Sequence, residues 1–469
     1  MASIPGLRGL ILAATAAVIA SAGAVYVLMQ PDDGTRKITG TAASAPGLGW
    51  SVDAAATHGN AKAEFRDPRA GTEYDMGGSP GFIDAGDTLL AVVGVSAGDM
   101  SVKEPMLVGI DAETGAVRWR TPAPHLEGCG GAPVDGRLVC VTAPSAEPTA
   151  LVGYDIASGQ VTRTPTDWQV FALATVDNHV YVAEGDVESD DVRVHSGTLA
   201  DPAANWSRSF AMGTSWEDIT SDTLDVSHGQ GLLNLGVQLA GFDLGTGAST
   251  WTTDLGGCSR TIATSTALVE RINTECSGYH VTGTDLFDRT GRVLAATDSE
   301  ATHSLSIDRP TDDTVPVLLA DGAYDRRTGK RAWTSPDLVT KPRNTNSDNS
   351  NATTGTATAI LGDIALLRDS DARNMTGLDM RTGHRLWQLE TERYGTVLAW
   401  DGHVVVLTDT TGLWAIDPRS GTTVWDIPFL AVNNNRDAFD GSGQLTARDN
   451  GRYVYTSART MIGLRPIDH

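Results

Sequence analysis

The sequence contains few basic residues. Its 469 residues include 35 Lys and Arg against 58 Asp and Glu, so the formal net charge at pH 7 is −23. Binding to nucleic acid requires clusters of Lys and Arg that neutralise phosphates. The composition therefore argues against nucleic acid as a partner. The simplest interpretation of the acidic excess is a solvated surface of carboxylates.

The motifs of several common catalytic sites are also missing. The ten His residues form no HExxH metal motif, and no Ser lies in a GxSxG nucleophile elbow. The four Cys residues include no adjacent pair, no CxxC and no CxxCH, so neither a zinc site nor a haem-attachment site is expected. We therefore predict no catalytic residue, no cofactor-binding residue and no metal ligand.

Two polar segments are rich in oxygen-bearing side chains, and the first of them could offer ligands to calcium. Segment 433–441 is rich in Asn and Asp, but EF-hand spacing counted back from Gly441 places Arg436 and Ala438 at the first and third ligand positions. The acidic run 188–191 has the composition of a surface turn. We interpret both segments as solvated loops.

Long apolar runs are absent after residue 30, but one stands before it. Residues 10–29 carry no charged side chain, and at about 1.5 Å per residue a helix of this length crosses a ~30 Å hydrocarbon core. Arg8 precedes the run, and Asp32 and Asp33 follow it. The positive-inside rule then places the N-terminus in the cytoplasm and the main body outside the membrane.

This pattern predicts a single-pass protein of the cell membrane with an extracytoplasmic body. The expected divisions are a cytoplasmic N-terminus, a transmembrane helix, a tether and one large domain, at residues 1–9, 10–29, 30–45 and 46–469. The alternative is a cleaved signal peptide, because Ala20-Ser21-Ala22 and Ala22-Gly23-Ala24 both fit a small-residue cleavage site. We favour the uncleaved anchor, since the apolar run is longer than the usual core of a signal peptide.

The four cysteines fall into two pairs at the ends of predicted hairpins. Cys129 and Cys140 flank a strand, an Asp-Gly turn and a second strand, and Cys258 and Cys276 flank a longer stretch of the same kind. The two ends of an antiparallel hairpin lie close to the Cα separation that a disulfide needs. An extracytoplasmic location makes oxidation the expected state. The sequence therefore predicts the disulfides Cys129–Cys140 and Cys258–Cys276.

An internal repeat dominates the remaining sequence. Its clearest copies are LVGIDAETGAVRW (107–119), LVGYDIASGQVTR (151–163), LAGFDLGTGASTW (239–251), GAYDRRTGKRAW (322–333), TGLDMRTGHRLW (376–387) and LWAIDPRSGTTVW (413–425). The shared pattern is an apolar strand, Asp, two variable residues, Thr or Ser, Gly, three residues and Trp. The repeat residues are Asp111, Gly115, Trp119, Asp155, Gly159, Asp243, Gly247, Trp251, Asp325, Gly329, Trp333, Asp379, Gly383, Trp387, Asp417, Gly421 and Trp425.

Each conserved element of the repeat has a physical role in a hairpin. The Asp side chain accepts hydrogen bonds from backbone N–H groups further along the turn. Gly takes the positive-φ position that closes the turn, and Trp buries a large apolar surface on the returning strand. A second hairpin precedes most copies, as in VDGRLVCV (134–141) and WDGHVVVL (400–407). Two hairpins per repeat make a four-stranded sheet, which is the blade of a β-propeller.

The two ends of the body complement each other. The last run, TMIGLRPID (460–468), matches the strand that precedes each repeat Asp, and the chain stops where the turn would follow. The missing Trp strand is present at the other end as GLGWSVD, which contains Trp50. We predict that one blade combines strands from both termini. We expect eight blades, in a range of seven to nine, with the weak copies 192–206 and 285–295 as the doubtful units.

The repeat resembles that of the quinoprotein-like propeller family, whose repeats are named for pyrroloquinoline quinone (PQQ). The resemblance covers roughly residues 46–469 and implies an all-β propeller. The family includes quinone-dependent alcohol and glucose dehydrogenases, and also the non-catalytic BamB scaffold of outer-membrane protein assembly. Its enzymes characteristically stack the quinone on two adjacent cysteines beside a calcium ion, although some members lack this pair, and this sequence has no such pair. A propeller fold by itself does not specify a function.

Two functions follow from this resemblance. We favour a non-catalytic, membrane-anchored scaffold or receptor that binds a protein or polymer of the bacterial cell envelope and has no cofactor. The alternative is a PQQ-dependent dehydrogenase of alcohols or sugars, with PQQ and calcium as its cofactors. Four tryptophans fall outside the repeat position, and any that is exposed on a loop is a candidate for partner binding: Trp168, Trp216, Trp400 and Trp414.

Overall fold

The computed structural model describes residues 45–467 except 74–77, 98–100, 144, 145, 147, 215–218, 220–222, 255–258, 264–267, 276–279, 342–352, 392, 394 and 440–442. The predicted membrane span, 10–29, lies outside the described residues. Within the described ranges, no helix is both long and apolar enough to cross a membrane.

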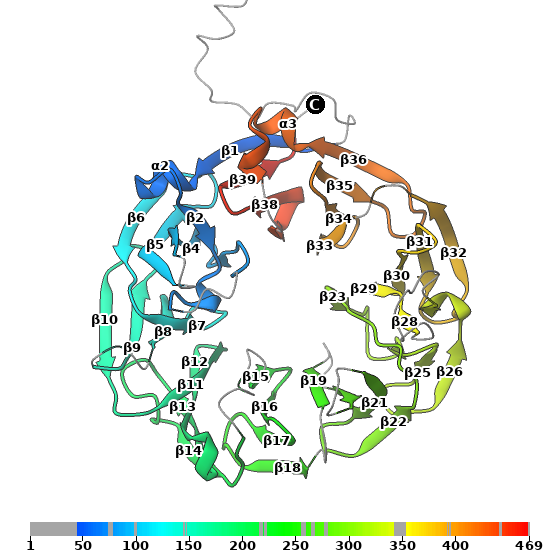
Figure 1. Cartoon of the computed structure of the whole chain (residues 1–469), viewed down its shortest axis with the longest axis horizontal. Helices are drawn as coiled ribbons and strands as arrows, with labels where there is room; N and C mark the ends of the chain where they lie inside the picture. The colour runs from blue at the N-terminus through cyan, green and yellow to red at the C-terminus, as the bar shows by residue number, and fades with distance from the viewer. Residues whose placement is uncertain are drawn as a thin grey trace, which may run out of the picture.

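Antiparallel sheets are arranged around a ring (Figure 1). We number the blades along the chain. Blade 1 contains β2 (Glu64–Arg66), β3 (Ile83–Asp84), β4 (Thr88–Ser96), β5 (Val102–Asp111) and β6 (Val117–Pro122), and blade 2 contains β7 (Leu126–Cys129), β8 (Arg137–Thr142), β9 (Ala150–Asp155) and β10 (Val161–Pro165). Blade 3 contains β11 (Val170–Val176), β12 (His179–Asp186), β13 (Asp191–Gly197) and β14 (Trp206–Phe210), and blade 4 contains β15 (Leu224–Ser227), β16 (Gln230–Leu235), β17 (Gln238–Asp243) and β18 (Ser249–Asp254). Blade 5 contains β19 (Ser259–Ala263), β20 (Val269–Thr274), β21 (Val281–Phe287) and β22 (Val293–Thr297).

The remaining four blades complete the ring. Blade 6 contains β24 (Val317–Leu319), β25 (Gly322–Tyr324) and β26 (Arg331–Thr334), and blade 7 contains β23 (Ile307–Arg309), β29 (Ala357–Leu361), β30 (Ile364–Asp369), β31 (Asn374–Asp379) and β32 (Arg385–Glu390). Blade 8 contains β33 (Thr396–Trp400), β34 (Val405–Thr408), β35 (Gly412–Ile416) and β36 (Thr423–Pro428). Blade 9 contains β1 (Gly47–Asp53), β37 (Gln444–Arg448), β38 (Arg452–Thr456) and β39 (Thr460–Arg465). The short pair β27 (Val339–Thr340) and β28 (Thr354–Gly355) and the helices α2 (Ala54–His58) and α3 (Phe429–Val432) stand beside these blades.

The propeller has nine blades, so the prediction of eight was wrong. Both doubtful units are complete four-stranded blades. In blade 3 a longer loop separates β13 from Trp206, which still reaches the repeat position. In blade 5 the turn carboxylate is Asp288, one residue later than the pattern requires, and it accepts hydrogen bonds from the backbone and hydroxyl of Thr290. Ala295 takes the place of the Trp there and pairs with Leu286.

The Asp–Gly turns join the last two strands of most blades in the expected way. Asp111 Oδ1 accepts hydrogen bonds from the backbone N–H groups of Glu113 (3.0 Å) and Thr114 (2.8 Å) and from the Thr114 hydroxyl (2.8 Å). Gly115 has φ +71°, which a residue with a side chain rarely adopts. Desolvation raises the pKa of Asp111, but the hydrogen bonds from Arg118 and Thr114 outweigh it and lower the pKa to about 2.

The repeat tryptophans join neighbouring blades. Trp119 of β6 lies opposite Gly109 of its own blade and covers Gly159 in the turn of blade 2. Its indole N–H donates to the carbonyl of Ile156 in that turn (2.9 Å). Because the partner across the strand is Gly, the indole lies flat against the sheet and reaches the next blade. The same donation to the following turn occurs at Trp50, Trp206, Trp333 and Trp387, whose acceptors are the carbonyls of Ala112, Leu244, Met380 and Pro418.

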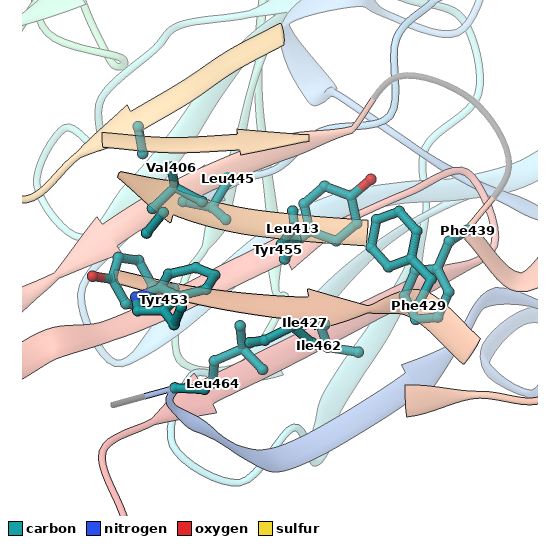
Figure 2. Packing of buried hydrophobic residues seen from close by; sticks show 14 of the residues in the cluster. Val406, Leu413, Ile427, Phe429, Phe439, Leu445, Tyr453, Tyr455, Ile462 and Leu464 are labelled. Atoms are coloured by element: carbon teal, nitrogen blue, oxygen red, sulfur yellow. The ribbon is translucent and has the colours of Figure 1, made fainter. Parts of the chain in front are cut away.

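The ring closes through a blade made from both ends of the described chain. β1 pairs with β39 in antiparallel register, with Trp50 opposite Gly463, so the termini share one sheet as predicted. The core between blades 8 and 9 is rich in aromatic side chains (Figure 2). Phe429 of α3 stacks on Phe439 with ring centroids 4.4 Å apart, and Tyr455 of β38 lies 5.5 Å from Phe429.

One of the two predicted disulfides is confirmed. Cys129 of β7 lies directly opposite Cys140 of β8, and the two form a disulfide. Both cysteines are buried in the core between blades 1 and 2. The bridge closes a loop of 11 residues, and a loop of this size contributes about 3 kcal/mol in the chain-entropy model. Cys258 and Cys276 lie outside the described residues.

The pattern of one blade per repeat is broken between blades 6 and 7. Blade 6 has three strands in the described part of the chain, and β23, which precedes it in sequence, pairs instead with β29 of blade 7. This pairing is parallel, whereas neighbouring strands in the other blades are antiparallel. β23 therefore crosses from its own repeat to the next blade, where it forms the strand nearest the centre of the ring (Figure 1).

Candidate functional site

The two ends of the blades present different structures to solvent. Within blade 2 successive strands are antiparallel, so the connection from β8 to β9 and the connection from β10 to β11 lie at the same end. We call the side of the ring that carries these connections the loop face. The Asp–Gly turns lie at the opposite ends of the strands. Since these turns are built alike in most blades, variation that can serve recognition is concentrated on the loop face.

A hollow opens on the loop face between blades 2 and 3. Its volume is about 230 Å³, and it is lined by Val141, Thr142, Thr149, Thr166, Asp167, Trp168, Gln169 and Val170. We call this hollow the Trp168 pocket. Small-molecule sites in proteins usually measure roughly 300–1,000 Å³. The Trp168 pocket is therefore sized for one ring-shaped group and not for a large cofactor.

The indole of Trp168 is held in place by a buried histidine. The rings of Trp168 and His195 are stacked, with centroids 4.0 Å apart and planes inclined by 10°. His195 is 4% exposed, and its Nε2 donates to Glu184 Oε1 at 3.0 Å, because an ionised carboxylate only accepts hydrogen bonds. Its Nδ1 is buried and has no hydrogen-bond partner among the described residues. One face of the indole is thus covered by a rigid imidazole from blade 3.

The threonines of the Trp168 pocket have hydrogen-bonding capacity to spare. Thr142 and Thr166 accept from the backbone N–H groups of Ala150 (2.9 Å) and Trp168 (3.1 Å), which leaves both hydroxyl protons free to donate. Thr149 donates its proton to the Thr166 carbonyl (2.7 Å), so its hydroxyl oxygen can still accept.

Two further polar side chains flank the indole. Asp167 and Gln169 are exposed, and neither side chain has a hydrogen-bond partner among the residues described. The pocket therefore offers donors, acceptors and an aromatic surface together.

A second hollow lies between inner strands of blades 7, 8 and 9. It measures about 280 Å³ and is lined by residues of β23, β33 and β37 and by Ser306, with Trp400 at one wall. The indole N–H of Trp400 is buried without a hydrogen-bond partner in the described part of the protein. Arg309 is the exposed cation of this hollow. The two hollows are on different blades and share no residue.

Trp414 belongs to a structural cluster. It is 5% exposed, and the guanidinium of Arg393 lies 3.9 Å from the centre of its ring. Arg393 also bonds Asp409 (2.7 Å) and Asp426 (2.8 Å). Burial lowers the pKa of Arg393, but these two carboxylates outweigh the effect and raise it. The Arg393 guanidinium therefore has its partners within the fold, and it connects the segment before blade 8 to that blade.

The two described cysteines differ in arrangement from the adjacent pair that is characteristic of the quinone-dependent enzymes. Cys129 and Cys140 lie on separate strands and are bonded to each other, so they do not form the adjacent pair on which the quinone stacks. Over the described ranges, no group of three His, Cys, Asp or Glu side chains could hold a metal ion. The described residues of the polar segment 433–441 and of the acidic run 188–191 contain no such group.

Comparison with known proteins agrees with the architecture. A family model described as outer membrane protein assembly factor BamB matches residues 236–427 and, in an overlapping match, 318–465. These matches span the repeats of blades 4 to 9. The chain is a β-propeller of PQQ-type repeats. Among curated proteins, this PQQ-repeat propeller has no match.

Several solved structures resemble the PQQ-repeat propeller at low sequence identity. BamB from Moraxella catarrhalis is 16% identical over 74% of this chain and 93% of its own, with a TM-score of 0.35. The dihydro-heme d1 dehydrogenase NirN is 12% identical over 78% and 72%, with a TM-score of 0.42. Sqt1 from Saccharomyces cerevisiae is 9% identical over 91% and 100%, with a TM-score of 0.43.

The structure separates the four tryptophans that lie outside the repeat of this PQQ-repeat propeller. Trp168 borders the Trp168 pocket on the loop face, Trp400 lines the second hollow between blades 7, 8 and 9, and Trp414 is buried. Trp216 lies outside the described residues. Sequence reasoning missed His195 and Glu184, because no motif marks a histidine whose role is to support an aromatic ring contributed by another blade.

Proposed function

We propose that this protein is a membrane-anchored, extracytoplasmic scaffold that binds an envelope partner through the Trp168 pocket. The observation that carries the proposal is the pocket itself. A tryptophan outside the inter-blade position is held by a buried His–Glu pair and lies beside Asp167 and Gln169, two polar side chains without partners among the described residues. The match to a family model named for an assembly factor supports a role in binding rather than turnover.

The uncharged run 10–29 supports the anchored location. Arg8 before the run and Asp32 and Asp33 after it orient the propeller to the outside. We expect that protease added to intact spheroplasts digests the propeller, and that the protein sediments with membranes and is released by detergent but not by salt. A mature N-terminus between residues 20 and 35 would show instead that the run is a cleaved signal peptide and that the protein is secreted.

The non-catalytic role predicts that the quinone does not bind. The full chain, solubilised in detergent, is titrated with pyrroloquinoline quinone and calcium while its melting temperature and the quinone absorbance are followed. Ligand at a hundred times its dissociation constant adds about 2.7 kcal/mol to the stability of a folded protein that binds it. We expect no shift in melting temperature and no dye reduction with alcohols or sugars. A shift accompanied by dye reduction would identify a dehydrogenase and refute the scaffold.

A further inference from the structure

We propose that the Trp168 pocket binds a neutral sugar ring of an envelope polysaccharide. This inference rests on the proposed function and specifies its partner. The first argument is the indole surface. The C–H groups on one side of a pyranose ring carry small positive charges, and the face of an aromatic ring is negative, so the two attract each other when stacked. Trp168 offers such a surface beside a hollow sized for one ring.

The second argument is the type of polar group around the indole. Four of the eight lining side chains are neutral hydroxyls or an amide: Thr142, Thr149, Thr166 and Gln169. Thr142 and Thr166 retain protons to donate, while Thr149 and Asp167 retain lone pairs to accept. A sugar presents hydroxyls that both donate and accept, and it can therefore satisfy both kinds of group at once.

The third argument excludes other chemical classes. The exposed carboxylate of Asp167 and the net charge of −23 disfavour an anion. Only Val141 and Val170 add aliphatic surface, so a lipid chain would leave most of the lining polar groups unpaired. A cationic peptide side chain would have Asp167 as its single ion partner, and an exposed pair of this kind contributes little. The neutral ring satisfies the lining best.

Trp168 also has the preorganisation that a weak ligand requires. His195 stacks on the indole and is fixed by Glu184, so the aromatic surface is in position before the ligand arrives. A sugar then binds without the entropy cost of ordering the indole. His195 acts here as a positioning residue and does not line the pocket.

The test is calorimetric titration of the detergent-solubilised full chain with chitotetraose, maltotetraose and mannotetraose, and with tetra-arginine as the cationic probe. We expect at least one tetrasaccharide to bind with millimolar or tighter affinity, independently of salt concentration. Trp168→Ala should weaken that binding at least about tenfold, because the stacking contact is lost. Trp168→Tyr should restore part of it. Asp167→Asn should change it by less than about threefold, since the amide oxygen still accepts hydrogen bonds.

The matched control is Trp400→Ala, which removes an indole from the other hollow and should leave saccharide binding unchanged. Urea unfolding of each variant shows that it is folded. The proposal is overturned if no tetrasaccharide binds, or if binding survives Trp168→Ala. It is also overturned if tetra-arginine binds in a salt-dependent manner that Asp167→Asn abolishes, which would identify a site for basic peptides.

Crosslinking in intact envelopes separates this inference from the scaffold function. Crosslinks to an envelope protein that depend on Trp168, in the absence of saccharide binding, would leave the scaffold standing and refute the sugar. Saccharide binding by a protein that is soluble and released from cells would support the sugar and refute the anchored scaffold.

Discussion

Replacing Trp50 with alanine is expected to lower the free energy of unfolding by about 3–5 kcal/mol, the usual cost of truncating a buried aromatic residue. Trp50 is 9% exposed and lies opposite Gly463 of β39. Its indole also covers Gly115 in the turn of blade 1 and donates to the Ala112 carbonyl at 3.1 Å. One side chain thus joins the first strand of the described chain to its last strand and joins blade 9 to blade 1.

The same substitution should loosen both ends of the ring together. Amide hydrogen exchange over 460–465 should become faster, because β39 loses the side chain that secures β1 as its partner. The control is Val237→Ala, which truncates a side chain that is 42% exposed and should change the urea midpoint little. Unchanged exchange over 460–465 in Trp50→Ala would show that the ring is held closed without this seam.

Acid is expected to destabilise the propeller through His303 as the pH falls from about 6.5 to about 4. His303 is buried, and this desolvation lowers its pKa from 6.5 to about 4, although the hydrogen bond to the Ala320 carbonyl opposes the shift. Nε2 bonds that carbonyl at 2.8 Å, and Nδ1 accepts the backbone N–H of Ala357 at 3.3 Å. A proton on Nδ1 would remove the second bond and bury an unpaired charge between blades 6 and 7.

The direction of the effect follows from linkage. The unfolded chain binds a proton at His303 below its pKa of 6.5, whereas the folded chain binds one only near pH 4. The contribution of neutral His303 to the free energy of unfolding is therefore fully present above about pH 6.5. It is lost as the pH falls, and the loss amounts to about 3 kcal/mol in total. Urea midpoints between pH 7.5 and 4.5 measure this loss. His303→Gln should flatten the profile, while the control His179→Gln, at an exposed position, should leave it unchanged. An identical profile in His303→Gln would assign the acid sensitivity to other groups.

The blade count shows where pattern reasoning on the repeat reached its limit. The eight-blade prediction treated the two weak copies as doubtful: 192–206 is a degenerate copy of the pattern, and 285–295 has Phe287 and Ala295 where Asp and Trp would stand. Trp206 nonetheless reaches its place after a longer loop, and Asp288 forms its turn from a shifted position. A hairpin tolerates such changes in its connection as long as the strands on either side can still pair. The repeat motif consists mainly of residues of the turn, whereas the formation of a blade depends on whether the strands can pair.

The crossing of β23 into blade 7 illustrates a different limit. Ile307–Arg309 is a strand of three residues, and neither its composition nor its position in the repeat favours a parallel partner. It pairs with β29 of blade 7 and not with β24, the first strand of the next sheet along the chain. The identity of residues 307–309 alone does not predict this choice of partner strand.

The sequence by itself determined the repeat, the propeller, the pairing of Cys129 with Cys140 and the closure through Trp50. Each of these depends on local chemistry at fixed spacing: an Asp that starts a turn, a Gly that accepts positive φ, a Trp opposite a small residue, and two cysteines across one hairpin. Only the tertiary structure decided that Trp168 borders a pocket while Trp414 is buried. That difference depends on His195 and Arg393, which come from other parts of the fold and meet the two indoles only after the blades have packed. Contacts of this kind leave no periodic signal in a sequence, because a single side chain at one seam of the ring is enough to make them.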